Sequence, residues 1–210
     1  VDNIITWLDF AGIAVFAISG ALVASRKCLD PVGFALIATV TGMGGGTVRD
    51  LLLAQPVYWV HQPSYIVLCV SMALAVYFIA PHIEYRFRAL MWADALGLSL
   101  FSVLGASVAI DAGFSGIIAV VMGMLSATFG GLIRDVLCGE IPLILRKEIY
   151  ATAALCGALV FTLLNPLPIP YPAAEIGGIV SCFIVRALGL GLGWSLPNYR
   201  PRKGRNYPRE

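Results

Sequence analysis

The sequence predicts an all-α, polytopic membrane protein with seven transmembrane helices, arranged as two inverted three-helix repeats followed by a seventh helix. Its composition, the lengths of its apolar runs and the distribution of its basic residues all support this class. Hydrophobic residues occupy 59% of the 210 positions and charged residues only 12%, whereas a soluble domain carries roughly 25% charged residues. A chain with so few charges cannot cover a water-soluble surface, but it suits a surface that faces lipid.

Seven apolar runs meet the length that a membrane span requires, which is about 18 or more mostly apolar residues. The expected spans are residues 4–25, 31–53, 64–80, 90–110, 114–138, 148–165 and 173–194. Prolines and charged residues separate the runs, as in Asp30-Pro31 and the proline-rich stretch 165–172. The first run lacks a basic leader and a clear cleavage site, so we expect it to remain as a helix of a single membrane domain.

The basic residues outside the spans fall on one side of the expected bundle. That side carries Arg26, Lys27, Arg86, Arg88, Arg146, Lys147 and the five lysines and arginines of the tail 197–210. The N-terminus and the loops near residues 54–63, 111–114 and 165–172 contain no lysine or arginine. Because cytoplasmic loops are enriched in lysine and arginine, the N-terminus is predicted to lie outside and the C-terminus in the cytoplasm.

The sequence also aligns with itself, without a gap, at an offset of 85 residues. The matched pairs include Asp9 with Asp94, Gly45 with Gly130, Gly46 with Gly131, Arg49 with Arg134, Asp50 with Asp135 and Tyr65 with Tyr150. Repeat one covers about 4–80 and repeat two about 90–165. Each repeat holds three spans, so the second copy must enter the membrane in the opposite direction. The span 173–194 is then an appended seventh helix, followed by a basic cytoplasmic tail over 197–210.

Two glycine-rich segments lie inside the second and fifth spans, where the chain reads GMGGGTVRDLL (42–52) and ATFGGLIRDVL (127–137). Glycine inside a helix costs up to about 1 kcal/mol relative to alanine. The main hypothesis is that both spans are broken at these glycines and cross near the membrane centre, around a polar pathway. The alternative is that the glycines permit close helix packing. The predicted hinge and pore residues are Gly42, Gly44, Gly45, Gly46, Gly130 and Gly131.

Charged residues follow directly after both glycine runs. An arginine or aspartate at the centre of a membrane helix costs roughly 2.5–3.5 kcal/mol, so these side chains should face the interior of the bundle. The predicted pore charge cluster is Arg49, Asp50, Arg134, Asp135, Asp9 and Asp94.

The partners within this cluster follow from helix geometry, because consecutive residues point to different sides of a helix. We therefore expect Arg49 to pair with Asp135 and Arg134 with Asp50, or the arginines to meet Asp9 and Asp94. A purely structural role for the charges is the alternative. Two further charged residues, Arg186 and Glu175, stay outside the predicted site, since a lone arginine near a helix end can extend to the interface.

The sequence gives little support for an enzymatic function or for a bound cofactor. The five cysteines are scattered and His61 and His82 stand alone, so neither a metal site nor a disulfide framework is expected. The glycine run lacks the lysine of a phosphate-binding loop, and the chain contains no G-x-S-x-G or H-E-x-x-H motif. We expect no enzyme activity, no nucleic-acid partner and no cofactor, apart from a permeant potassium ion or a bound lipid.

On the runs GMGGGTVRDLL and GGLIRDVLCGEIPLIL and the following EIYAT (148–152), residues 7–196 resemble the prokaryotic branch of the trimeric intracellular cation (TRIC) channel family. Sequences of this kind are also labelled uncharacterised bacterial membrane proteins and glycine transporter domains. The resemblance implies a homotrimer in a bacterial or archaeal inner (plasma) membrane, with a potassium-permeable pore in each subunit around bent spans two and five. Phe129 and Ala127 depart from the glycine pattern of the first bend, which implies asymmetric bends.

Three functions follow from these observations. The first is a passive, potassium-preferring channel for monovalent cations, in which backbone carbonyls and Asp50 and Asp135 favour cations while Arg49 and Arg134 restrain conduction. The second is a secondary transporter for a small zwitterion such as glycine, whose carboxylate would rest on an arginine or a half-helix N-terminus. The third is a scaffold with structural charges only.

Overall fold

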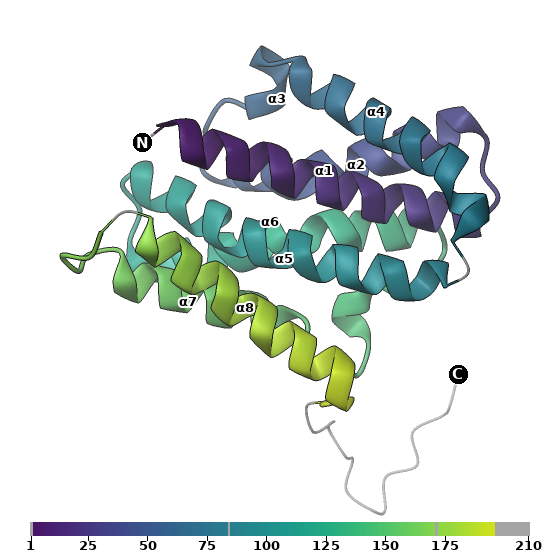
Figure 1. Cartoon of the computed structure of the whole chain (residues 1–210). Helices are drawn as coiled ribbons and strands as arrows, with labels where there is room; N and C mark the ends of the chain where they lie inside the picture. The colour runs from purple at the N-terminus through teal and green to yellow at the C-terminus, as the bar shows by residue number, and fades with distance from the viewer. Residues whose placement is uncertain (1, 84, 171, 196–210) are drawn as a thin grey trace, which may run out of the picture.

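The computed structural model describes residues 2–83, 85–170 and 172–195, and every long element in these ranges is an α-helix. The predicted basic tail 197–210 lies outside the described residues. Figure 1 shows the helices side by side in one bundle, with α1 and α5 running in opposite directions. The long helices are α1 (Asp2–Arg26), α2 (Pro31–Leu52), α4 (Ser64–Ile79), α5 (Arg86–Asp111), α6 (Gly116–Leu137), α7 (Ala151–Leu164) and α8 (Ala173–Leu192).

These bounds agree with the expected spans to within a few residues. Six of the helices are long and apolar enough to cross a membrane, with mean hydropathy between 1.3 and 2.0 over their best windows. The seventh, α7, is apolar but has only 14 residues, which corresponds to about 21 Å of helix against a hydrocarbon core of about 30 Å. The chain is therefore a multi-pass, all-helical membrane protein with six candidate spans and a shorter apolar helix.

Local signals explain where α2 begins and how the chain leaves α2 and α6. The Asp30 carboxylate accepts a hydrogen bond from the Gly33 N–H at 2.7 Å, and Pro31 occupies the first turn, which is a stabilising helix start. After α2 the chain turns through Ala54 with a φ of 53°, and after α6 it turns through Gly139 with a φ of 62°. The two turning residues are 85 positions apart, as the internal repeat predicts.

Three short helical turns lie in the connections. They are α3 (Tyr58–His61), η1 (Ala80–His82) and η2 (Leu143–Leu145). Arg26, Lys27, Arg86, Arg88, Arg146 and Lys147 lie in or next to the connections after α1, α4 and α6, and we call this side of the molecule the basic end. The connections after α2, α5 and α7 form the opposite end.

The packing of the two halves is reciprocal. Helix α1 packs against α5, and α2 packs against α6, while α8 covers α5 and α7. At the α1–α5 contact the rings of Phe16 and Phe101 stack with their centroids 5.3 Å apart. A Cβ atom on Gly97 would meet the Phe16 ring at 2.6 Å, and one on Gly12 would meet the Phe101 ring at 2.9 Å. Each phenylalanine therefore lies in a gap that a glycine of the other repeat leaves open.

Candidate functional site

The two glycine segments lie where α2 and α6 cross, as expected, but neither helix is broken there. The α-helix runs without interruption through Pro31–Leu52 and through Gly116–Leu137. The prediction of discontinuous spans is therefore wrong. The cost of glycine in a helix is small enough for the surrounding packing to offset it.

Close approach of the backbones explains why glycine is needed at this crossing. A Cβ atom on Gly45 would collide with the carbonyl oxygen of Ser126, and a Cβ atom on Gly130 would collide with the carbonyl oxygen of Thr41. The two contacts are equivalent under the 85-residue offset. A Cβ on Gly44 would meet Ile133 and Gly130 of α6. The alternative hypothesis of close helix packing is thus the one that the structure supports.

The other predicted glycines border the same crossing. A Cβ on Gly42 would lie 3.1 Å from the Cys69 sulfur, and one on Gly46 would lie 2.8 Å from the Tyr58 ring. A Cβ on Gly131 would lie 3.0 Å from the Tyr150 hydroxyl and 3.4 Å from the Arg134 guanidinium. Gly46 and Gly131 therefore leave room for the aromatic side chains that stand beside each Arg–Asp pair.

The arginine of each pair binds the aspartate that follows it in the same helix. Arg49 Nη2 lies 2.7 Å from Asp50 Oδ1, and Arg134 Nε lies 2.8 Å from Asp135 Oδ1. No ion pair joins Arg49 to Asp135 or Arg134 to Asp50 among the described residues, so the cross-repeat pairing is wrong. The Cβ directions of neighbouring residues diverge, but the long arginine stem folds back far enough to reach the adjacent carboxylate.

The second oxygen of each aspartate binds the chain that returns after the helix. Asp50 Oδ2 accepts a hydrogen bond from the Tyr58 N–H at 3.1 Å, and Asp135 Oδ2 accepts one from the Leu143 N–H at 3.0 Å. Sequence reasoning missed both donors. The 85-residue offset relates Tyr58 to Leu143 and would have linked them, but nothing in the sequence indicates that a backbone N–H is the partner.

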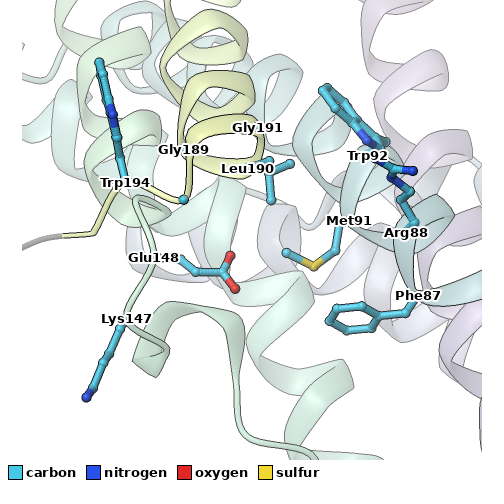
Figure 2. Close-up of a pocket in the computed structure, with 11 residues that line it drawn as sticks. Phe87, Arg88, Met91, Trp92, Lys147, Glu148, Gly189, Leu190, Gly191 and Trp194 are labelled. Atoms are coloured by element: carbon cyan, nitrogen blue, oxygen red, sulfur yellow. The ribbon is translucent and has the colours of Figure 1, made fainter.

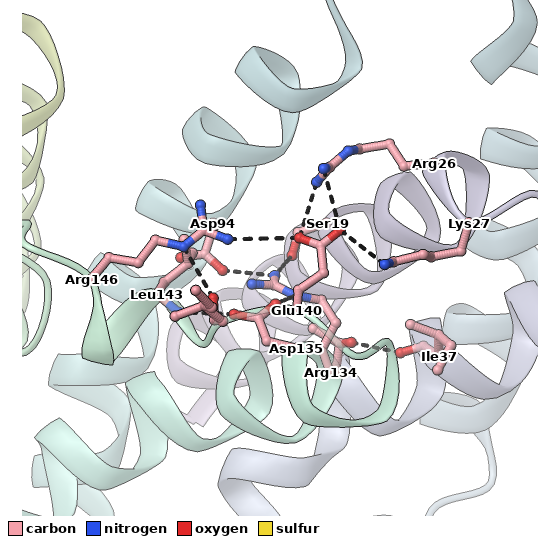
Figure 3. A network of polar contacts seen from close by, with 12 residues as sticks. Ser19, Arg26, Lys27, Ile37, Asp94, Arg134, Asp135, Glu140, Leu143 and Arg146 are labelled. Atoms are coloured by element: carbon pink, nitrogen blue, oxygen red, sulfur yellow. Dashed lines mark hydrogen bonds and ion pairs between the residues drawn. The ribbon is translucent and has the colours of Figure 1, made fainter. Parts of the chain in front are cut away.

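The alternative pairing with the first helix of a repeat is confirmed for repeat two. Arg134 Nη1 lies 2.8 Å from Asp94 Oδ1 on α5, and it donates a 2.6 Å hydrogen bond to Ser19 Oγ on α1. The side chains of Arg134 and Asp94 have no exposed surface. Figure 3 shows this network at the junction of α1, α5 and α6. Two carboxylates, Asp94 and Asp135, thus compensate the charge of a fully buried arginine.

Repeat one differs at the equivalent position. Asp9 stands close enough to Arg49 and Tyr65 to interact electrostatically with both, yet no ion pair joins Asp9 to Arg49 among the described residues. The Arg49 guanidinium instead lies 5.8 Å from the centre of the Tyr58 ring. The two halves therefore share the Arg–Asp–backbone motif but not the third charged partner.

A cavity of about 380 Å³ reaches the Arg49–Asp50 pair from the opposite end of the molecule. Its walls include Gln55 and Tyr58 after α2 and Asp111 at the end of α5. The carboxylates of Asp50 and Asp111 and the guanidinium of Arg49 thus line this cavity. This cavity, which we call the acidic vestibule, therefore carries a net negative charge and lies at the ends of α2 and α5.

Arg186 is more deeply buried than expected. Its side chain has no exposed surface, and it binds the Glu148 carboxylate and the Ile149 carbonyl oxygen, each at 2.9 Å. Its guanidinium also lies 5.0 Å from the centre of the Tyr150 ring. The expectation that this arginine extends to the interface is therefore wrong, because the segment before α7 supplies it with partners inside the bundle. Glu175 is also buried.

A second cavity, of about 400 Å³, lies at the basic end between the start of α5 and the end of α8. The Glu148 side chain points towards Met91, whereas the Lys147 amine points away from it (Figure 2). None of the predicted glycines or Arg–Asp pairs lines this cavity. We therefore base the candidate site on the α2–α6 crossing, the two Arg–Asp pairs and the cavity at Arg49.

Comparisons with known proteins agree with this arrangement. The family model described as "Glycine transporter" matches residues 6–81 and again residues 91–166, two segments whose bounds differ by 85. The UPF0126 inner membrane protein YadS of Escherichia coli is 38% identical over 199 residues, which cover 93% of this chain and 96% of that protein.

Solved structures give a close match to the fold. The TRIC trimeric intracellular cation channel orthologue from Rhodobacter sphaeroides has a TM-score of 0.89 and 47% identity, covering 91% of this chain and all of that one. A prokaryotic TRIC channel has a TM-score of 0.87 and 32% identity, covering 93% and 100%. Together with the glycine segments and the duplicated Arg–Asp pairs, these matches establish that the chain belongs to the prokaryotic TRIC channel family, whose members also carry the descriptions glycine transporter and UPF0126 membrane protein.

Proposed function

We propose that this protein is a passive, potassium-permeable channel for monovalent cations, with a pore in each subunit of a homotrimer. The observation that carries the proposal is the pair of buried Arg–Asp motifs at the ends of α2 and α6, close to the point where these helices cross. Charged groups inside a membrane protein are costly, and they mark ion pathways when they face the bundle interior. The similarity to TRIC cation channels supports the same function.

The vestibule favours cations over anions. Asp50 and Asp111 place two carboxylates at the cavity, while the single guanidinium of Arg49 is held by Asp50. Because α2 and α6 are continuous, their carbonyls are largely occupied by helical hydrogen bonds. We therefore assign the cation preference to the carboxylates rather than to free backbone carbonyls.

The proposed layout in the membrane is two inverted repeats and an appended helix. Repeat one contains α1, α2 and α4, repeat two contains α5, α6 and α7, and α8 follows. The reciprocal contacts of Phe16 with Gly97 and of Phe101 with Gly12 support this layout, because a twofold relation exchanges both partners of a contact. The description of YadS as an inner membrane protein supports a bacterial inner membrane location, and the charge distribution favours an N-terminus outside and a C-terminus in the cytoplasm.

A secondary transporter for a small zwitterion such as glycine is the second candidate, and the description of the matching family model favours it. Arg49 lines a cavity and could hold a carboxylate. However, this function would draw on half-helix N-termini at the membrane centre, and the continuous α2 and α6 do not provide them. We therefore rank the transporter below the channel.

Planar-bilayer recording of the purified protein distinguishes the two functions. In a potassium chloride gradient, the channel predicts unitary currents whose reversal potential follows the potassium equilibrium potential. Radiolabelled glycine uptake into proteoliposomes provides the comparison. Saturable glycine uptake without unitary currents would overturn the channel in favour of the transporter.

A further inference from the structure

One carboxylate at the basic end holds three cations. Glu140 Oε1 lies 3.2 Å from Arg26 Nη2 and 3.6 Å from Lys27 Nζ, and Glu140 Oε2 lies 3.7 Å from Arg146 Nη2. Only 12% of the Glu140 side chain is exposed. Figure 3 shows Arg26, Lys27 and Arg146 converging on it.

These residues come from segments that are distant in sequence. Arg26 and Lys27 end α1, whereas Glu140 and Arg146 belong to the connection between α6 and α7. The Phe87 ring at the start of α5 completes the cluster, because the guanidinium groups of Arg26 and Arg146 lie 4.9 Å and 5.6 Å from its centre. We call these five residues the Glu140 clasp. The clasp joins the connections of the basic end to one another.

The clasp stands next to the buried Arg134 site. The Glu140 N–H donates a 2.8 Å hydrogen bond to the carbonyl oxygen of Asp135, which is itself paired with Arg134. Cys138 lies between them, close enough to Arg134, Lys27 and Glu140 for all three charges to act on its thiol. The clasp therefore lies directly between the buried Arg134 site and the basic end of α6.

The described residues of the other repeat form no such cluster. At the equivalent positions, 85 residues earlier or later, Gln55 replaces Glu140 and Asp111 replaces Arg26. A neutral amide and a carboxylate cannot form an ion pair, and both of these residues line the cavity that reaches Arg49. The same backbone framework thus carries a cavity beside the Arg–Asp pair of one repeat and a cluster of ion pairs beside the Arg–Asp pair of the other.

We propose that the Glu140 clasp is the gate of the ion pathway at its basic end, closed while Glu140 holds its three cations and open when they separate. The proposal rests on the channel function proposed above. The three cations are 25–36% exposed, and ion pairs with this exposure are weak and screened by salt. They can therefore break and re-form, unlike the Arg134–Asp94 pair, which has no exposed surface.

Single-channel recording tests the gate through the variant Glu140→Gln, which keeps the shape of the side chain and removes its charge. The expected result is a several-fold higher open probability with an unchanged reversal potential. Asp30→Asn is the matched control, because it removes one negative charge at the same end, outside the clasp, and asparagine also caps the start of a helix. An open probability that Glu140→Gln leaves unchanged, or that both variants raise equally, overturns the gate.

Cys138 offers a second readout that needs no current. Its thiol is half-buried, and burial raises the pKa of the thiol above its ordinary value, so little reactive thiolate is present at neutral pH. In a Cys28→Ala background, which removes the exposed cysteine, Glu140→Gln should increase the rate at which a water-soluble maleimide labels the Cys138 thiolate several-fold in proteoliposomes. The rate is measured by mass spectrometry over a range of pH and divided by the thiolate fraction, because loss of the Glu140 charge also lowers the pKa of the thiol.

The two readouts separate the failure of the gate from the failure of the channel. Equal Cys138 labelling rates with and without the Glu140 charge would overturn the gate even if the protein conducts. Faster labelling without unitary currents in any variant would instead overturn the channel function, while showing that the clasp holds this end closed.

Discussion

Arg134 is a fully buried charged residue that links α6 to both α5 and α1. Its guanidinium binds Asp135, Asp94 and Ser19 with no exposed surface. The sequence indicated that such an arginine must face the interior, because a charge exposed to lipid is costly. It could not indicate which carboxylate binds it, since side-chain reach and the approach of α1 and α5 depend on tertiary packing. This explains why the pairing with Asp94 was one of two predicted alternatives.

The asymmetry between Asp94 and Asp9 leads to a stability prediction. Asp94→Asn leaves the fully buried Arg134 with Asp135 as its one carboxylate partner, and loss of a hydrogen bond between charged groups typically costs about 1.5–3 kcal/mol. Asp9→Asn is the matched control from the other repeat, where no ion pair to Arg49 forms among the described residues. Unfolding in detergent, followed by circular dichroism, should show a clearly larger loss for Asp94→Asn. Equal losses would contradict the asymmetry between the repeats.

At the scale of helices, the sequence was sufficient to place every long element. Apolar runs long enough to span a membrane, with prolines between them, leave few alternative positions for the helices. The helix bounds therefore agree with the expected spans to within a few residues. The turns α3 and η2 were missed because they have only four and three residues. The glycine runs were misread as breaks because glycine both weakens a helix and lets another helix approach. Only the position of α6 over Gly45 decides between these effects.

The close packing of α2 against α6 gives the second prediction. In Gly45→Ala the new methyl group would meet the Ser126 carbonyl oxygen, so the helices must separate, and such overpacking costs typically about 1–3 kcal/mol. Gly191→Ala on α8 is the control, because its Cβ would meet no atom within 4 Å and alanine is the better helix former. Thermal unfolding should show a lower midpoint for Gly45→Ala and an unchanged or higher one for Gly191→Ala. A tolerated Gly45→Ala would argue for a flexible hinge instead.

At the scale of the whole molecule, duplication followed by divergence is the main feature. The 85-residue offset recurs in the family-model match, in the turns after α2 and α6 and in the paired Asp–backbone contacts. The sequence predicted this framework because matched Arg–Asp pairs are improbable by chance. It did not predict that a cavity reaches the Arg–Asp pair of one repeat while ion pairs lie beside that of the other, since this difference depends on which loop residues meet in space.

Inversion of the repeats predicts that equivalent loops face opposite sides of the membrane. Lys27→Cys and Ala112→Cys occupy equivalent positions in the two repeats. In a Cys28→Ala background, a membrane-impermeant thiol reagent added to intact cells should label position 112 but not position 27, and inverted vesicles should give the reverse. Labelling of both positions from the same side would contradict the inverted layout.

The acidic vestibule is the most direct place to test cation conduction. Asp111 lines the cavity and is exposed, so Asp111→Asn should leave the fold intact. In single-channel recordings at about 0.1 M potassium chloride, where charges act over about 10 Å, the variant should have a lower unitary conductance than the wild type. In a potassium chloride gradient, both should reverse near the potassium equilibrium potential. At about 1 M salt, where that range falls to about 3 Å, the difference should disappear. Equal conductances at the lower salt concentration, or reversal near the chloride potential, would contradict a cation pathway that enters through this vestibule.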